Sequence, residues 1–155
     1  MVFVDRAADT CEQDMEKGDV SEKHVRDVLR RSQNGLRFVK FLKDENLMVR
    51  SAAARIVAWK GPLEEIAKAA LVEEDRGLLL DMMRLLAWKK QYVEMLTGYL
   101  TSQDDIIKEA AVEMFRRAGK TEYLFPMVFD EDDETVERTK RYMDEKGKSG
   151  KVCGS

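Results

Sequence analysis

Apolar positions along the chain recur at the spacing of one α-helix face, and the whole pattern repeats every 29 residues. One apolar column with this step is Val20, Val49, Leu78, Ile107 and Val136, and a second is Leu42, Leu71, Leu100 and Phe129. Three further columns in the same register are Phe41, Ala70, Tyr99, Val128; Phe38, Ala67, Leu96, Phe125; and Val28, Val57, Leu86, Phe115. A fixed period of this length is typical of proteins built from stacked structural repeats.

Each repeat predicts a shorter helix A followed by a longer helix B, because its apolar residues recur at i, i+3, i+4 and i+7. The predicted A helices cover 36–43, 62–72, 91–101 and 121–129. The predicted B helices cover 20–32, 47–60, 76–89, 105–118 and 134–146. An additional N-terminal helix is predicted over 3–17, where Asp9 and Gln13 stand at positions that are apolar in the A helices.

Short polar residues and glycines mark the ends of the predicted B helices. Four side chains precede B helices and are expected to cap the free N–H groups of the first turn: Asn46, Asp75, Asp104 and Asp133. Glycines close after B helices are expected to end them with a positive φ: Gly35, Gly61, Gly119 and Gly147. Pro126 lies inside an A helix, where a missing donor is expected to kink or break it.

Composition supports an all-α protein with one domain. The 155 residues are 44% hydrophobic and 37% charged, with only 2 prolines and 9 glycines, which favours long helices with short connections. We predict a single repeat domain over 1–146, in which 1–19 form an N-terminal cap segment, and a disordered tail over 147–155.

Two B segments carry a family resemblance. VRSAAARIVAWKG at 49–61 and IKEAAVEMFRRAG at 107–119 resemble the short HEAT-like repeat of bilin lyases, with its Val-Arg pair, alanine-rich turn and closing glycine. The likeness covers about 20–147, although LLLDMMRLLAWKK at 78–90 replaces the Val-Arg pair and both alanines. The resemblance implies a right-handed α-solenoid of stacked helix hairpins whose B helices line a concave surface. It also implies a binding or scaffolding role, and it does not imply lyase activity.

The side chains on the B-helix face that points away from the A helices are the candidate binding site. Helical steps of four from Ser51 select Arg55 and Trp59, and the 29-residue repeat adds the equivalent positions Leu80, Arg84 and Trp88. The same columns add Arg26, Arg30, Arg117 and Tyr142. Tryptophan and arginine dominate the energetics of protein interfaces, so we expect a protein or peptide partner, with an acidic segment suited to the arginines. The competing interpretation is that Trp59 and Trp88 pack against the next repeat.

Nucleic-acid binding is the alternative function. Basic residues gather near the C-termini of the B helices and form a predicted basic rim: Arg30, Arg31, Lys60, Lys89, Lys90, Arg116, Arg117 and Lys120. Arginines beside exposed aromatic rings can hold phosphates and stack bases. However, the chain has a net charge of −3, and the helix macrodipole alone favours cations at these positions, so we rank this alternative below protein binding.

The chain lacks a constellation of residues suited to catalysis or metal binding, so we predict a non-enzyme without cofactor or metal. His24 is the only histidine and stands in an apolar column, which favours a structural role. The two cysteines, Cys11 and Cys153, form neither a zinc motif nor a disulfide framework and suit a reducing cytoplasm. No secretion signal or membrane-spanning stretch is recognisable, so we expect no membrane association.

Overall fold

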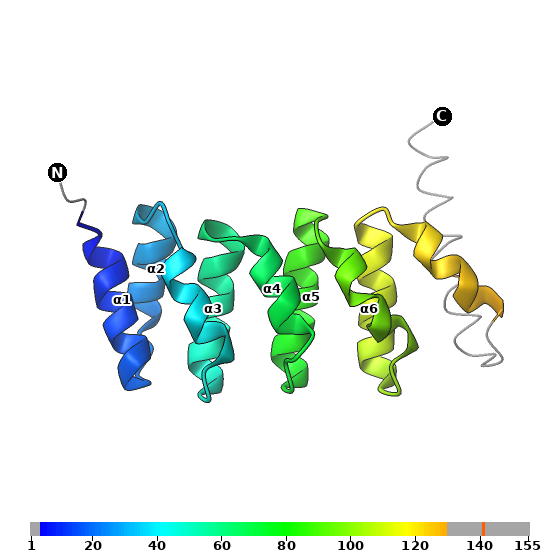
Figure 1. Cartoon of the computed structure of the whole chain (residues 1–155), viewed down its shortest axis with the longest axis horizontal. Helices are drawn as coiled ribbons and strands as arrows, with labels where there is room; N and C mark the ends of the chain where they lie inside the picture. The colour runs from blue at the N-terminus through cyan, green and yellow to red at the C-terminus, as the bar shows by residue number, and fades with distance from the viewer. Residues whose placement is uncertain (1–3, 130–140, 142–155) are drawn as a thin grey trace. The chain divides into compact units, whose positions relative to one another are not determined.

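A computed structural model describes residues 4–129 and Arg141, and every regular element among them is helical. The order along the chain is α1 (Arg6–Lys17), α2 (Glu22–Arg31), η1 (Leu36–Lys43), α3 (Leu47–Lys60), α4 (Leu63–Ala70), α5 (Arg76–Lys89), η2 (Val93–Thr101), α6 (Asp105–Arg117) and η3 (Thr121–Phe129) (Figure 1). These bounds agree closely with the predicted A and B helices. The all-α prediction is confirmed for these residues, whereas the predicted helix 134–146 lies outside them except for Arg141.

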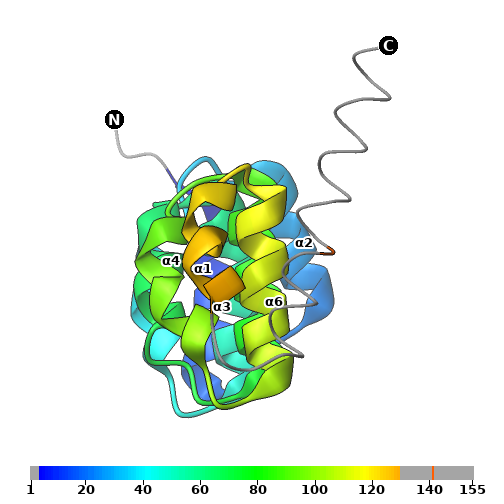
Figure 2. The same ribbon diagram turned by 90° about the vertical axis from the view of Figure 1, so that its right-hand side faces the viewer.

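The chain divides into two compact units, Met1–Met82 and Met83–Ser155, and the boundary falls inside α5. In the first unit α1 packs against α2, α2 against α3, and α3 against both η1 and α4. Consecutive helices of this unit run in alternating directions through short connections (Figures 1 and 2). In the second unit α6 packs against η2 and η3. Each unit therefore contains hairpins that join a short helical segment to a longer α-helix.

The predicted helix starts are confirmed wherever they lie within the described residues. The Asn46 side chain accepts a hydrogen bond from the Met48 N–H at 2.9 Å, and Asp104 accepts one from the Ile106 N–H at 2.9 Å. Asp75 accepts from the Leu78 N–H, also at 2.9 Å. Each bond satisfies a donor that the first helical turn leaves without an intrahelical partner. Asp133 lies outside the described residues.

Three of the four short segments are 3-10 helices, and only α4 is an α-helix. The difference follows local composition, because α4 contains Ala67, Ala69 and Ala70, whereas η1 is rich in aromatic and β-branched residues. The segment η3 runs without interruption from Thr121 to Phe129, so Pro126 does not break it. At 9 residues, η3 is longer than most 3-10 helices, whose hydrogen-bond geometry is poorer than that of an α-helix.

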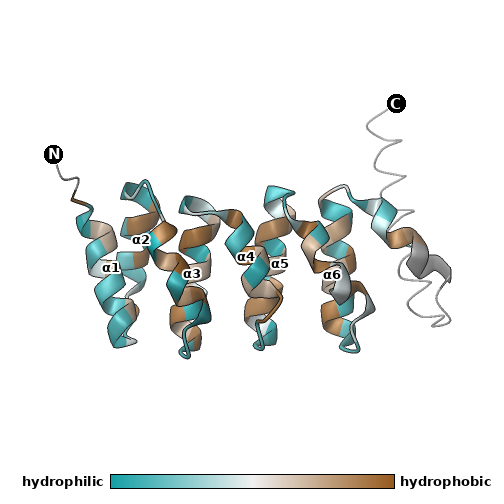
Figure 3. Cartoon of the chain, viewed as in Figure 1, coloured by the Kyte–Doolittle hydropathy of each residue, from teal (hydrophilic) through white to brown (hydrophobic). Residues whose placement is uncertain are grey.

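The repeat columns form most of the core, although Val20, Tyr99 and Ile107 are only half-buried and two further members are exposed. Val28, Val57, Leu86 and Phe115 are each fully buried, as their shared register predicts. Leu71 and Phe125 are exposed, although the other members of their columns whose burial is described are buried. Leu71 comes directly after the last residue of α4, and Leu124 is buried in place of its neighbour Phe125. Hydrophobic residues make up much of α3, whereas α1 is largely hydrophilic (Figure 3).

Glycines end only one of the described B helices in the predicted way. Gly119 has a φ of 77°, but Gly35 and Gly61 do not adopt a positive φ, so that part of the prediction is wrong. Gly35 instead allows a close backbone approach, because its N–H donates to the Lys60 carbonyl oxygen at 2.7 Å. A Cβ at this position would lie 3.0 Å from the Lys60 carbonyl carbon, which is tighter than nine in ten real Cβ contacts.

Lys90 occupies the repeat position of Gly61 and Gly119, and its φ is 56°. A left-handed conformation costs a residue with a Cβ roughly 1–2 kcal/mol. We therefore expect Lys90→Gly to raise the free energy of unfolding by up to about 1 kcal/mol, after the larger entropy of glycine in the unfolded chain is subtracted. Urea unfolding measures the change. Gln91→Gly, at a neighbouring position without a positive φ, should not stabilise, and equal effects of both substitutions would contradict the prediction.

Charged side chains of α1 explain why its polar residues do not disrupt packing. Glu12 pairs with Lys40 at 2.6 Å, and its carboxylate also accepts from the Arg37 Nε at 2.8 Å. Burial alone would raise the pKa of Glu12, but the hydrogen bonds from Lys40 and Arg37 outweigh burial and lower it. Asp9 pairs with Arg37 at 2.7 Å. Ion pairs therefore replace the apolar contacts that other repeats make at these positions.

Cys11 lies in the core of the first unit beside these ion pairs. Burial raises the pKa of its thiol to about 11, and the negative charge of Asp14 adds to the effect. In a Cys153→Ser chain we expect Cys11 to react with Ellman's reagent at pH 8 about two orders of magnitude more slowly than an exposed thiol, because the thiolate is the reactive form. Full reaction in guanidinium is the control. Rapid stoichiometric reaction of the folded chain would contradict the buried position.

Candidate functional site

Trp59 lies near the end of α3 on the side opposite the core. The helix buries Ala53, Ile56 and Val57 completely, whereas the Trp59 side chain is 47% exposed. This difference follows from helical periodicity, because Trp59 stands four residues after Arg55 on the more polar stripe. The ring therefore presents nearly half of its surface to solvent.

Arg55, one turn before Trp59, is held by a carboxylate of α2. Its two terminal nitrogens donate to the two oxygens of Glu22, both at 2.9 Å. The hydrogen bond from Arg55 lowers the pKa of Glu22, and the same bond raises the pKa of Arg55. A partner's carboxylate that approaches Arg55 must therefore compete with Glu22 for these donors.

Arg26 and Arg30 follow Glu22 at steps of four on α2, and both side chains are exposed. The Glu22–Arg55 pair joins positions 33 residues apart on two helices that run in the same direction (Figure 1). One turn further along both helices, the same offset places Arg26 level with Trp59. The first unit thus brings an aromatic ring and cationic side chains to the same face of α2 and α3.

The remaining central candidates lie on α5, at steps of four. Leu80 is half-buried and belongs to the first unit. Arg84 is exposed and belongs to the second unit, as does Trp88, whose side chain is 74% exposed. Each unit therefore carries one solvent-exposed tryptophan on a long helix. Tyr142 lies outside the described residues.

Arg117 and its neighbours in the second unit are engaged in ion pairs. Glu113 accepts from the Arg117 Nε at 2.6 Å and pairs with Arg116 at 2.6 Å, while Lys120 pairs with Glu94 at 3.0 Å. Burial alone would raise the pKa of Glu113, but the hydrogen bonds from Arg116 and Arg117 outweigh burial and lower it. Two carboxylates thus pair with three cations of the predicted basic rim.

Sequence reasoning missed exposed apolar residues on the long helices, among them Met48 and Ile106. Met48 in the first turn of α3 and Ile106 in the first turn of α6 are both exposed. They occupy the same position of the 29-residue repeat, where the other repeats have Asp19 and Gly77. The column contains apolar, acidic and glycine residues, unlike the uniformly apolar core columns. This difference is the signal that could have identified Met48 and Ile106 as exposed. Met48 lies seven residues before Arg55, on the same side of α3.

The chemistry available at these faces is that of recognition. An exposed indole offers apolar contact area and a π surface, and neighbouring guanidinium groups offer charge-assisted hydrogen bonds. Within residues 4–129, no group of three or more His, Cys, Asp or Glu side chains could hold a metal ion. His24 forms a hydrogen bond with Asp14, which links α2 to α1.

Comparison of the chain with protein families, with curated proteins and with solved structures finds no match. None of the described helices is both long and apolar enough to cross a lipid bilayer.

Proposed function

We propose that the chain is a non-catalytic repeat protein of the cytoplasm that binds a protein or peptide through the exposed face of its B helices. The observation that carries the proposal is the exposure of both tryptophans, 47% for Trp59 and 74% for Trp88. Large aromatic side chains are normally buried at least in part, and exposed ones are enriched at binding surfaces. Arg26, beside Trp59, favours a partner with acidic residues.

The proposed architecture is a right-handed, HEAT-like α-solenoid in which successive 29-residue hairpins stack. Its support is the recurrence of capped helix starts at Asn46, Asp75 and Asp104, and the contacts of α3 with η1 and α4 in the first unit. Repeats of this kind bury a continuous core by packing on their neighbours.

The accessibility of each ring can be measured separately, because the chain contains only two tryptophans. In Trp59→Phe and Trp88→Phe chains, acrylamide should quench the remaining fluorescence efficiently, and Trp88 should be quenched more than Trp59. The reason is the larger exposed fraction of Trp88. Weak quenching of both rings, at the level of a fully buried indole, would remove the proposed binding surface.

The function itself is tested by selection from a random peptide library on the immobilised full chain. We expect the enriched peptides to combine acidic with large apolar residues, and Arg84→Glu with Trp88→Ala should reduce their binding at least tenfold with unchanged helicity. Lys17→Gln with Lys43→Gln is the control for general charge effects. Failure to enrich any peptide would contradict the proposal, as would salt-sensitive capture of single-stranded DNA instead.

A further inference from the structure

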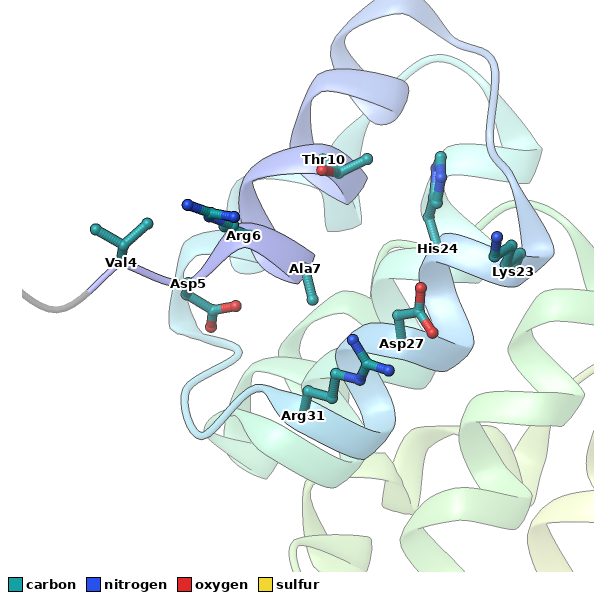
Figure 4. Close-up of a pocket in the computed structure, with 9 residues that line it drawn as sticks. All are labelled: Val4, Asp5, Arg6, Ala7, Thr10, Lys23, His24, Asp27 and Arg31. Atoms are coloured by element: carbon teal, nitrogen blue, oxygen red, sulfur yellow. The ribbon is translucent and has the colours of Figure 1, made fainter.

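A cleft of about 450 Å³ lies in the first unit between α1 and α2, far along the chain from both tryptophans. Its walls come from Arg6, Ala7 and Thr10 of α1 and from Lys23, Asp27 and Arg31 of α2, among others (Figure 4). This volume falls within the range of small-molecule sites. The cleft therefore has room for a ligand of moderate size.

Two groups at the cleft already have structural partners. Asp5 accepts a hydrogen bond from the Ala8 N–H at 3.0 Å and another from the Ser32 hydroxyl at 3.0 Å. His24 is held by Asp14. These bonds tie the start of α1 to the end of α2 and the end of α1 to the start of α2. The two walls of the cleft are thus fixed to each other at both ends.

Four charged side chains of the cleft are not engaged in such bonds. Arg6, Lys23, Arg31 and Asp27 have no hydrogen-bond or ion-pair partner within the described part of the chain. When Asp5 is included, the side chains that line the cleft carry three positive and two negative charges, a local charge of +1, in a chain whose net charge is −3. A local concentration of positive charge in an acidic chain attracts anions.

The repeat provides an internal comparison for this surface. Ala52 and Ile56, one repeat after Lys23 and Asp27, are buried in α3, which packs against α2. Lys23 and Asp27 instead line an open cleft, where polar residues are required. Acidic residues would meet that requirement as well as basic ones. It therefore does not explain why three of the four charged side chains without a partner are positive.

The three cationic side chains are also distributed unevenly along the cleft. Because Asp5 bonds Ser32, their chain neighbours Arg6 and Arg31 lie on opposite walls at the same end of the cleft. Lys23 lies eight residues before Arg31, about 12 Å along the helix axis, and Asp27 lies between them. A guanidinium group can donate two parallel hydrogen bonds to two oxygens of one phosphate. A carboxylate between the cations repels an extended polyanion but accepts hydrogen bonds from hydroxyl groups.

We propose that this cleft binds a small phosphate ester that carries hydroxyl groups. Its phosphate lies against Arg6 and Arg31, and its hydroxyl groups donate to Asp27, with the Thr10 hydroxyl on the opposite wall. Sugar phosphates and nucleoside monophosphates share this chemistry. The site is independent of the partner surface proposed above, because none of its residues belongs to that surface.

Calorimetry with the full chain tests the proposal with glucose 6-phosphate, adenosine monophosphate, inorganic phosphate and glucose as probes. We expect saturable binding of at least one ester, weaker binding of inorganic phosphate and no binding of glucose. Binding of only the sugar ester or only the nucleotide identifies the source of the phosphate. Absence of saturable binding by both esters, or inorganic phosphate binding as tightly as they do, would overturn the proposal.

Matched variants locate the site. Arg6→Gln with Arg31→Gln should weaken ester binding at least tenfold, because it removes charge-assisted hydrogen bonds. Lys17→Gln with Lys43→Gln removes the same charge elsewhere in the unit and should change affinity less than twofold. Equal losses in both double variants would show nonspecific attraction and reject the site. If a variant fails to fold, backbone NMR of the unmodified chain decides the same question. The changes in chemical shift that the ester causes must then cluster at Ala7, Thr10 and Asp27.

Discussion

Replacing Arg50 with methionine is expected to lower the free energy of unfolding by about 3–5 kcal/mol. The Arg50 and Glu73 side chains are only 17% and 3% exposed, and their charged atoms lie 3.0 Å apart. The Arg50 guanidinium also donates to the carbonyl oxygens of Asp44 and Glu45, at 2.9 and 3.1 Å. Methionine fills similar space but leaves the Glu73 carboxylate buried without its counterion. Urea unfolding followed by circular dichroism measures the loss.

Arg55→Met is the matched control, because it removes an arginine pair of similar geometry at an exposed position. Its expected cost is about 0–1 kcal/mol, since solvent screens exposed ion pairs. Combining Arg50→Met with Glu73→Leu should recover part of the loss, because no unpaired buried charge remains. Similar costs for Arg50→Met and Arg55→Met would show that the Arg50–Glu73 pair contributes no more than a surface pair.

Replacing Phe115 with alanine is expected to destabilise the second unit by about 3–5 kcal/mol. The Phe115 side chain is fully buried in α6, and its ring centroid lies 5.2 Å from that of Tyr123 at an interplanar angle of 45°. The substitution removes apolar burial and an aromatic contact and leaves a cavity. Thermal and urea unfolding both report this loss.

Phe125→Ala provides the comparison within the same unit, because Phe125 is 52% exposed despite its apolar column. Its expected effect is within about 0.5 kcal/mol, as for other surface substitutions. If Phe125→Ala proved as costly as Phe115→Ala, the 29-residue register would describe this segment better than the observed burial does.

Much of the secondary structure can be predicted from the sequence, because one period governs both apolar positions and helix starts. Asn46 and Asp104 cap as expected, since capping depends on residues that are neighbours in sequence. Gly35 was predicted to end a helix, but its role depends on Lys60, 25 residues away. The Arg50–Glu73 pair was missed for the same reason, because its partners are separated by 23 residues.

The candidate site could be predicted only in part. Periodicity selects Trp59 and Trp88 as outward residues on their helices, and both are exposed. It does not reveal that Glu22 occupies the donors of Arg55, because pairing between helices depends on their offset. Met48 was overlooked because its repeat column mixes apolar, acidic and glycine residues.

The bond between Gly35 and Lys60 joins two main chains, with the Gly35 N–H as donor and the Lys60 carbonyl as acceptor. The chemical identity of the lysine side chain does not enter into it. Natural variants of this protein should therefore tolerate many residues at position 60 while retaining glycine at position 35. An alignment of such variants should show an invariant glycine at position 35 and a variable residue at position 60, although the two positions share one hydrogen bond.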